Sequence, residues 1–190
     1  MINELVRKNR SYRRFYENLP INRDILIELI ELARLSPSAR NQQALKFILV
    51  SDEELNAKVF PEITWAGYLK EWHGPEKGER PSGYIIILGD KECGKNYDID
   101  LGIAAQSILF GAVEKGFGGC MILAFNKKNI KKIFNIPDRY ETSLIIALGK
   151  PLEIVVIDEM NEEGDIKYWR DEKQVHHVPK RSLDDLIVEF

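Results

Sequence analysis

The sequence predicts an α+β fold in which about four or five strands alternate with helices around one core. Two patterns indicate this class. Short continuous apolar runs of strand length recur along the chain, and segments with apolar residues at helical spacing separate them. The chain has 190 residues, of which 44% are hydrophobic and 30% charged, a balance typical of globular proteins. We therefore expect a single domain spanning residues 1–190.

The first half of the chain is expected to form helices around one strand. Residues 2–9 favour a short helix. Asn22 is a good N-cap for a second helix, which Ser36 and Pro37 should end. A β-rich run at 46–50 follows, and Ser51 begins a capping box for another helix.

The stretch 61–83 is irregular and separates these elements from the next strand. It carries Trp65, Tyr68 and Trp72 together with glycines, prolines and mixed charge. Loops of this length inside compact domains are often functional. We therefore expect it to cover part of a site.

The second half begins with the continuous apolar run 84–88, which predicts a buried strand. A long helix over 97–115 should follow, and its alanines and glycines permit close packing at the centre of the fold or at a subunit interface. Asn126 is the expected cap of a helix over 127–134, and Ser182 that of a final helix. The remaining predicted strands are 120–123, 144–148 and 154–157.

Composition narrows the setting and the partners. The net charge of −3 argues against a protein that binds polyanions over its whole surface. Cys93 and Cys120 form no CxxC pair, which favours a reducing compartment. No apolar run approaches the roughly 18 residues that span a bilayer, and no secretory h-region follows the N-terminal charges. We expect a cytoplasmic protein with no membrane partner.

Three segments carry groups suited to one phosphorylated, ring-bearing cofactor. The basic cluster at residues 10–15 and the pair Lys180 and Arg181 can bind a phosphate, because guanidinium groups grip its oxygens bidentately. The stretch 37–43 offers amides and a hydroxyl that suit a heteroaromatic edge. Two other interpretations stay open: a solvated basic arm, and a nucleic-acid site, since arginines alternate with aromatic residues there.

Other motifs are less specific. The glycines at 116, 118 and 119 follow a helix and precede a strand, the reverse of a dinucleotide fingerprint. They predict a helix C-cap and a turn, or alternatively a backbone surface open to a flat ring. His176 and His177 are adjacent and poorly placed to bind one ion, and Asp98 suits the first turn of a helix. We expect no metal and no catalytic side chain, so the chemistry would belong to a cofactor.

Together these segments resemble the nitroreductase family of flavoproteins over essentially the whole chain. Residues 10–15 resemble its R-S-x-R-x-F signature, and residues 37–43 its P-S-x-x-N-x-Q segment. Residues 116–121 resemble its helix–glycine–strand segment, and residues 145–151 its late strand ending in G-x-P. Two departures are Asn9, where relatives often have arginine, and Ala44-Leu45, where they often have Pro-Trp.

The resemblance implies a nitroreductase-like three-layer α/β/α sandwich with a mixed, mainly antiparallel sheet. It also implies a homodimer with FMN at the subunit interface. By it, the FMN phosphate would be held by Arg10, Ser11 and Arg13, aided by Lys180 or Arg181. Asn41 and Gln43 would meet the ribityl chain and the pyrimidine edge, in the same segment as Ser38. The backbone around Met121, Leu123 and Ala124 would lie against the isoalloxazine.

The implied activity is reduction of a nitro compound, quinone or related small molecule. Hydride from NADH or NADPH would pass through flavin N5. Reductive dehalogenation or ene reduction on the same scaffold is one alternative. A non-catalytic anion or nucleic-acid binder is another, although we expect no nucleic-acid partner.

Overall fold

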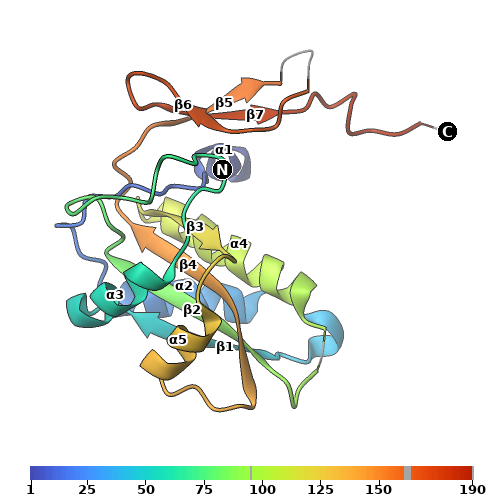
Figure 1. The fold of residues 1–190 in the computed structure, drawn as a ribbon. Coiled ribbons are helices and arrows are strands. Elements are labelled where there is room, and N and C mark those ends of the chain that lie inside the picture. Colours follow the sequence, from blue (N-terminus) through green and yellow to red (C-terminus); the bar gives the residue numbers. More distant parts are fainter. Residues whose placement is uncertain (95, 161–163, 190) are drawn as a thin grey trace.

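The computed structural model describes residues 1–94, 96–160 and 164–189. Its main body is built around a four-stranded antiparallel sheet with the strand order β1-β2-β4-β3 (Figure 1). The strands are β1 (Leu45–Val50), β2 (Gly83–Asp90), β3 (Gly118–Ile122) and β4 (Tyr140–Gly149). Every residue of β2 is buried, which explains why its sequence is apolar without alternation.

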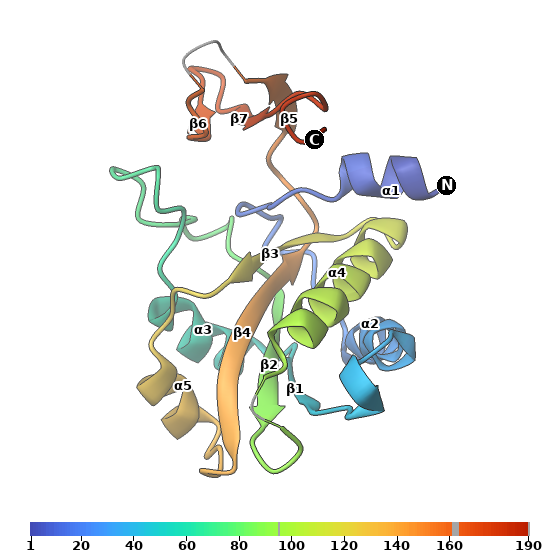
Figure 2. The same ribbon diagram turned by 90° about the vertical axis from the view of Figure 1, so that its right-hand side faces the viewer.

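Helices cover both faces of this sheet (Figure 2). Ile85 and Ile87 of β2 pack with α2 (Arg23–Leu35) and α4 (Asp98–Glu114) on one face. Tyr84 and Ile86 point the opposite way, toward α3 (Glu53–Val59) and α5 (Lys127–Ile133). The predicted α+β class and its three-layer arrangement are therefore confirmed.

Side-chain caps fix several helix boundaries. Asn22 accepts the Ile25 N–H at 2.9 Å, and Asn126 accepts the Asn129 N–H at 3.1 Å, as predicted. The cap of α3 is Asp52, which accepts the Leu55 N–H at 2.9 Å, so the prediction of a box starting at Ser51 was wrong by one residue. A short η1 (Ala39–Asn41) follows α2, and η2 (Phe60–Glu62) follows α3.

A second sheet lies beyond the main body and consists of β5 (Val155–Glu159), β6 (Trp169–Arg170) and β7 (His176–Lys180). Strand β7 is central, parallel to β5 and antiparallel to β6. Sequence reasoning missed β6 and β7, because neither contains an apolar run. The final helix expected after Ser182 is only a turn, in which Ser182 Oγ accepts the Asp185 N–H at 3.2 Å.

The N-terminal arm, residues 9–15, follows α1 (Ile2–Lys8) and packs against the ends of β3 and β4. The Tyr12 N–H donates to the Gly119 carbonyl at 3.0 Å, and Phe15 is fully buried. A Cβ at Gly118 would lie 2.5 Å from the Tyr12 ring. Close packing of the arm therefore requires glycine here, and the arm is not a solvated extension.

The aromatic segment 61–83 joins the main body to the second sheet. Trp65 is buried, and its ring lies 6.5 Å from that of Trp72. The Arg170 guanidinium of β6 sits 4.2 Å from the centre of the Trp72 ring. Tyr68 in turn contacts Tyr168, with 4.9 Å between ring centres. Within the described residues, no helix is long and apolar enough to cross a membrane.

Candidate functional site

A cavity of about 320 Å³ lies where the N-terminal arm, α4, β3 and the second sheet meet. We call it the arginine cavity. Its lining residues are Asn9, Arg10, Ser11, Arg13, Gln106, Leu109, Met121, Tyr168, His176, Val178 and Lys180. The fold thus brings together five residues that the sequence predicted to bind a cofactor, from chain segments far apart in sequence.

The charge of the arginine cavity is entirely positive. Arg10, Arg13 and Lys180 line it, and no carboxylate is among its lining residues. No carboxylate of the described residues lies within ion-pair distance of these three side chains. Three cations and the Ser11 hydroxyl form a donor set suited to an anion with several oxygens, such as a phosphate monoester.

The neighbouring arginines have a different role, because carboxylates neutralise them. Arg14 donates from Nε to Glu79 at 2.7 Å and also pairs through Nη2, which lowers the pKa of Glu79. Arg170 pairs with Glu153 at 3.0 Å. Composition alone could not distinguish these structural arginines from those facing the cavity.

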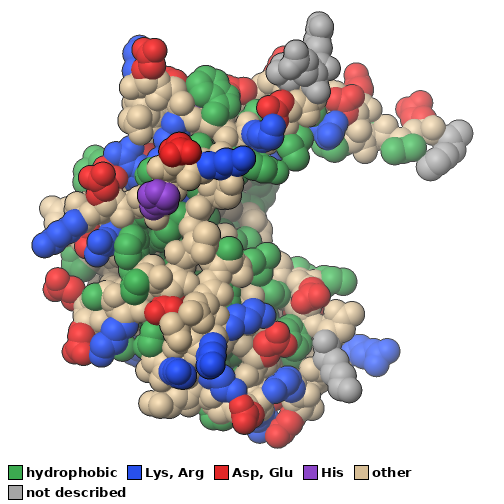
Figure 3. All heavy atoms as spheres, viewed as in Figure 1, with side chains coloured by type: hydrophobic (Ala, Val, Ile, Leu, Met, Phe, Trp, Pro, Cys, Tyr) green, Lys and Arg blue, Asp and Glu red, His purple; other side chains and the backbone are tan. Residues whose placement is uncertain are grey.

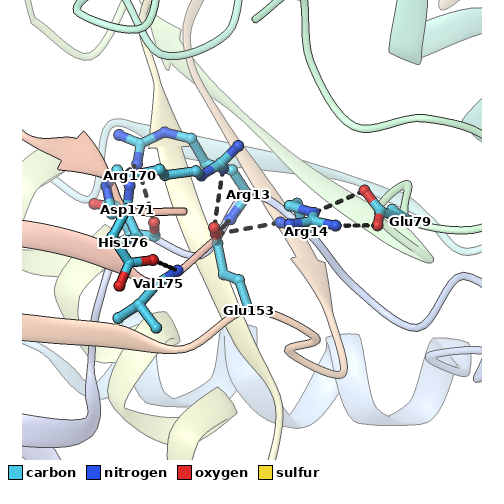
Figure 4. A network of polar contacts seen from close by, with 9 residues as sticks. Arg13, Arg14, Glu79, Glu153, Arg170, Asp171, Val175 and His176 are labelled. Carbon is cyan, nitrogen blue, oxygen red and sulfur yellow. Dashed lines mark hydrogen bonds and ion pairs between the residues drawn. The ribbon is translucent and has the colours of Figure 1, made fainter. Parts of the chain in front are cut away.

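Glu153 anchors the backbone of the N-terminal arm (Figure 4). Its Oε1 accepts the backbone N–H groups of Arg13 and Arg14, the latter at 3.3 Å, while Oε2 binds Arg170. The Glu153 side chain is fully buried. Buried carboxylates need such complete pairing, so this network fixes the arm relative to the second sheet.

His176 is in contact with Arg13 and is 1% exposed. Its Nε2 is 3.3 Å from Arg13 Nη1, and the Tyr168 ring centre is 4.9 Å from the same guanidinium. Burial, followed by the charges of Arg13 and Arg170, lowers the pKa of His176 to about 4. The imidazole is therefore neutral near pH 7. Sequence reasoning considered this residue only as a metal ligand and found no signal for Glu153, Tyr168 or Arg170.

The residues expected to meet the ribityl chain and the pyrimidine edge lie in a strained loop, residues 38–43, which we call the amide loop. Arg40, Asn41 and Gln43 have φ of 52°, 53° and 50°. Non-glycine residues in this left-handed region cost about 1–3 kcal/mol each and cluster at functional sites. Asp100 of α4 holds the loop by accepting the Ala39 N–H at 2.9 Å, and Ser38 Oγ accepts the Gln43 N–H at 3.2 Å.

The amide loop and the arginine cavity are separate in one chain. Ser38 and Gln43 border a different cavity, also about 320 Å³, together with Asp100 and Ala104. Asp100 and Leu109 point to roughly opposite sides of α4, given 3.6 residues per helical turn. A single chain therefore does not place the amides and the cations around one ligand.

The remaining predicted residues lie outside the arginine cavity. Arg181, Leu123 and Ala124 are exposed and do not line it. Gly119 is buried, and a Cβ there would lie 2.5 Å from the Ala147 carbonyl oxygen. Gly116, with φ of 76°, ends α4. These glycines serve the helix end and close packing, as the first of the two interpretations predicted. Over residues 1–94, 96–160 and 164–189, no His, Cys, Asp and Glu cluster could hold a metal ion.

Comparisons with known proteins agree with this architecture. A solved structure of an FMN-dependent nitroreductase from Clostridium difficile R20291 is 26% identical, with a TM-score of 0.63. The match covers 100% of this chain and 98% of that chain. MhqN of Bacillus subtilis (strain 168), provisionally named an NAD(P)H nitroreductase, is 25% identical over 187 residues, covering 77% of this chain and 86% of that protein.

A third relative carries a different activity in its name. The iodotyrosine deiodinase of Thermotoga neapolitana is 25% identical over 169 residues, which cover 80% of this chain and 89% of that protein. The model of the family described as the nitroreductase family matches residues 6–79 and 84–150, and so includes the N-terminal arm, the amide loop and β3. The chain belongs to the nitroreductase family and is an oxidoreductase.

Proposed function

We propose that this protein is an FMN-dependent NAD(P)H oxidoreductase that reduces nitroaromatic, quinone or related acceptors. The observation that carries the proposal is the arginine cavity. Three cations and a hydroxyl surround it without a carboxylate, in a chain of the nitroreductase family. The Clostridium difficile relative is named as FMN-dependent and MhqN as using NAD(P)H, and these names support the choice of cofactor and reductant.

The residues present fit the phosphate of FMN. Arg10, Ser11, Arg13 and Lys180 would hold it, whereas Arg181 is exposed and does not line the cavity. Met121 reaches the cavity from β3, and Leu123 and Ala124 lie exposed beyond it, where the flavin ring would extend. When bound, FMN supplies the hydride-transfer chemistry between NADH or NADPH and the acceptor. The side chains of the protein bind and orient the cofactor, and we assign none of them as an essential acid or base.

We further propose a homodimer with the flavin at the subunit interface. One chain separates the amide loop from the arginine cavity, so the partner subunit's Asn41 and Gln43 would complete the site. Figure 3 shows the second sheet and the C-terminal tail overhanging a hollow beside the main body. The tail exposes Leu183, Leu186, Ile187 and Val188. We expect these exposed apolar side chains to be buried against a second subunit.

Anaerobic turnover tests the reaction. The FMN-loaded protein should oxidise one equivalent of NADH or NADPH per FMN by itself, and should continue beyond this equivalent only when a nitroaromatic compound or a quinone is added. An Arg13→Ala variant should lose this activity at limiting FMN. Arg7→Ala is the matched control, because Arg7 is exposed on α1 and outside the cavity. An FMN-loaded protein that oxidises neither nucleotide with any acceptor would contradict the proposal.

Reductive dehalogenation is a second candidate, favoured by the similarity to the Thermotoga neapolitana deiodinase. A screen of halogenated phenols under the same anaerobic conditions separates the two activities. Release of halide faster than turnover of the nitroaromatic compound or the quinone would favour the dehalogenase. A colourless protein that binds oligonucleotides with steep salt dependence would instead indicate nucleic-acid binding.

A further inference from the structure

Two acceptors within the chain fix one end of the Arg13 guanidinium. Its Nη1 donates to the Ser11 carbonyl at 3.2 Å and lies 3.3 Å from His176 Nε2. For Nε and Nη2 of Arg13, the described residues provide no hydrogen-bond acceptor. An arginine can bind phosphate bidentately through Nε and Nη2 while Nη1 is held by the protein.

The contact between Arg13 and His176 requires a neutral histidine. Arginine has only donors, so Nε2 of His176 is the acceptor in this contact. The proton then sits on Nδ1, which is buried and has no hydrogen-bond partner among the described residues. Burial and the charges of Arg13, Arg170 and His177 lower the pKa of His176 to about 4, which keeps Nε2 unprotonated near pH 7.

The packing around His176 limits its freedom to move. Its ring centre is 5.2 Å from that of Tyr168, and the Tyr168 ring also contacts the Arg13 guanidinium. His176 therefore holds Arg13 from one side while Tyr168 supports its face. His177, the next residue of β7, contacts Asp158 at 2.8 Å and stacks on Trp169, with 4.1 Å between ring centres. The two adjacent histidines thus serve different partners.

We propose that His176 is a positioning residue for the cofactor phosphate. It holds Nη1 of Arg13 through a neutral Nε2 and so turns the free edge of the guanidinium toward the arginine cavity. This inference rests on the proposed FMN-binding function. It predicts that loss of His176 weakens binding of FMN but not of riboflavin, because riboflavin has the same ring and ribityl chain as FMN but no phosphate.

The test compares FMN and riboflavin affinities of the apoprotein by flavin fluorescence quenching. His176→Phe keeps an aromatic ring but removes the acceptor. It should weaken FMN binding about tenfold, the effect of losing roughly one charge-assisted hydrogen bond, and leave riboflavin binding unchanged. His176→Gln should retain FMN affinity, because its amide reaches the place of Nε2. His177→Phe is the matched control in the same strand and should change neither affinity.

A second pair of variants guards against misfolding of His176→Phe. His176→Asn is polar and neutral like His176→Gln, but its shorter side chain carries the amide near Nδ1. The asparagine variant should lose FMN affinity as the phenylalanine variant does. In the Arg13→Ala background, His176→Phe should cause no further loss, because His176 acts through Arg13.

The outcomes separate the two proposals. A parallel fall of FMN and riboflavin affinity in His176→Phe would overturn the positioning role and indicate general disruption. Equal FMN affinity of the asparagine and glutamine variants, or additive losses with Arg13→Ala, would overturn it as well. A wild-type protein that binds neither flavin would instead refute the proposed function itself, before any variant is compared.

Discussion

The arginine cavity and the amide loop place their polar groups by opposite means. In the cavity, Arg13 is held by long-range contacts, with Glu153 on its backbone and His176 on its side chain. In the amide loop, three residues within four positions adopt left-handed backbone, and one buried carboxylate, Asp100, anchors the turn. A network of charges is sensitive to the loss of any member, whereas a strained turn is sensitive to the local backbone. Substitutions in the two regions should therefore change stability and flavin affinity in different ways.

The largest effect is expected from Glu153→Ala. This variant leaves Arg170 buried without its carboxylate and frees the backbone amides of Arg13 and Arg14. Breaking a buried pair in this way costs about 3–5 kcal/mol of stability. Chemical denaturation should show this loss, and Glu172→Ala, an exposed position in the same region, should show almost none. Equal stability of the two variants would mean that the network does not anchor the arm.

Arg13→Ala should affect the cofactor more than the fold. Removal of one charge-assisted contact to phosphate should weaken FMN binding by about 1.5–3 kcal/mol. Riboflavin affinity should stay the same, because the lost contact involves only the phosphate. Titration of the apoprotein with both flavins measures the difference. A similar loss for both would place Arg13 beside the flavin ring instead of the phosphate.

Asp100→Ala should produce the opposite flavin pattern. The Ala39 N–H loses its buried acceptor, which should cost about 1–3 kcal/mol of stability and loosen the amide loop. Because the loop is proposed to meet the ring and ribityl chain, FMN and riboflavin should weaken together. Asp98→Ala, in the same turn of α4 but exposed, is the control. Selective loss of FMN alone would contradict the assignment of the loop.

The smallest effect is expected from Arg40→Gly. Arg40 has φ of 52° and ψ of 20°, a conformation that costs about 1–2 kcal/mol for a residue with a side chain. Glycine removes this cost but loses more backbone entropy, so we expect a net stabilisation of about 0.5–1 kcal/mol. Arg34→Gly in α2 should instead destabilise by about 1 kcal/mol. Thermal unfolding of both variants tests whether the loop is strained.

The sequence was informative where the signal is local. Asn22 and Asn126 cap their helices through residues three positions away, and the apolar run at 84–88 is buried on both sides. Of the left-handed residues of the amide loop, Asn41 is a type that favours this backbone conformation, but Arg40 and Gln43 gave no local signal for it.

Long-range contacts could not be predicted in this way. Glu153 contacts a backbone amide 140 positions earlier in the chain, and His176 contacts an arginine 163 positions earlier. Strand β7 contains proline and two histidines, so its pairing with β5 has no hydrophobic signature. The candidate phosphate-binding residues were therefore identifiable by type, whereas the groups that position them were not.

The most direct test of the central claim is the absorbance spectrum of the purified protein, followed by release and quantification of its chromophore. We expect flavin absorption bands and about one FMN per chain, the stoichiometry of one phosphate in each arginine cavity. A colourless protein that takes up no added FMN would contradict the assignment of the arginine cavity to the FMN phosphate, and the cavity would then bind another anion.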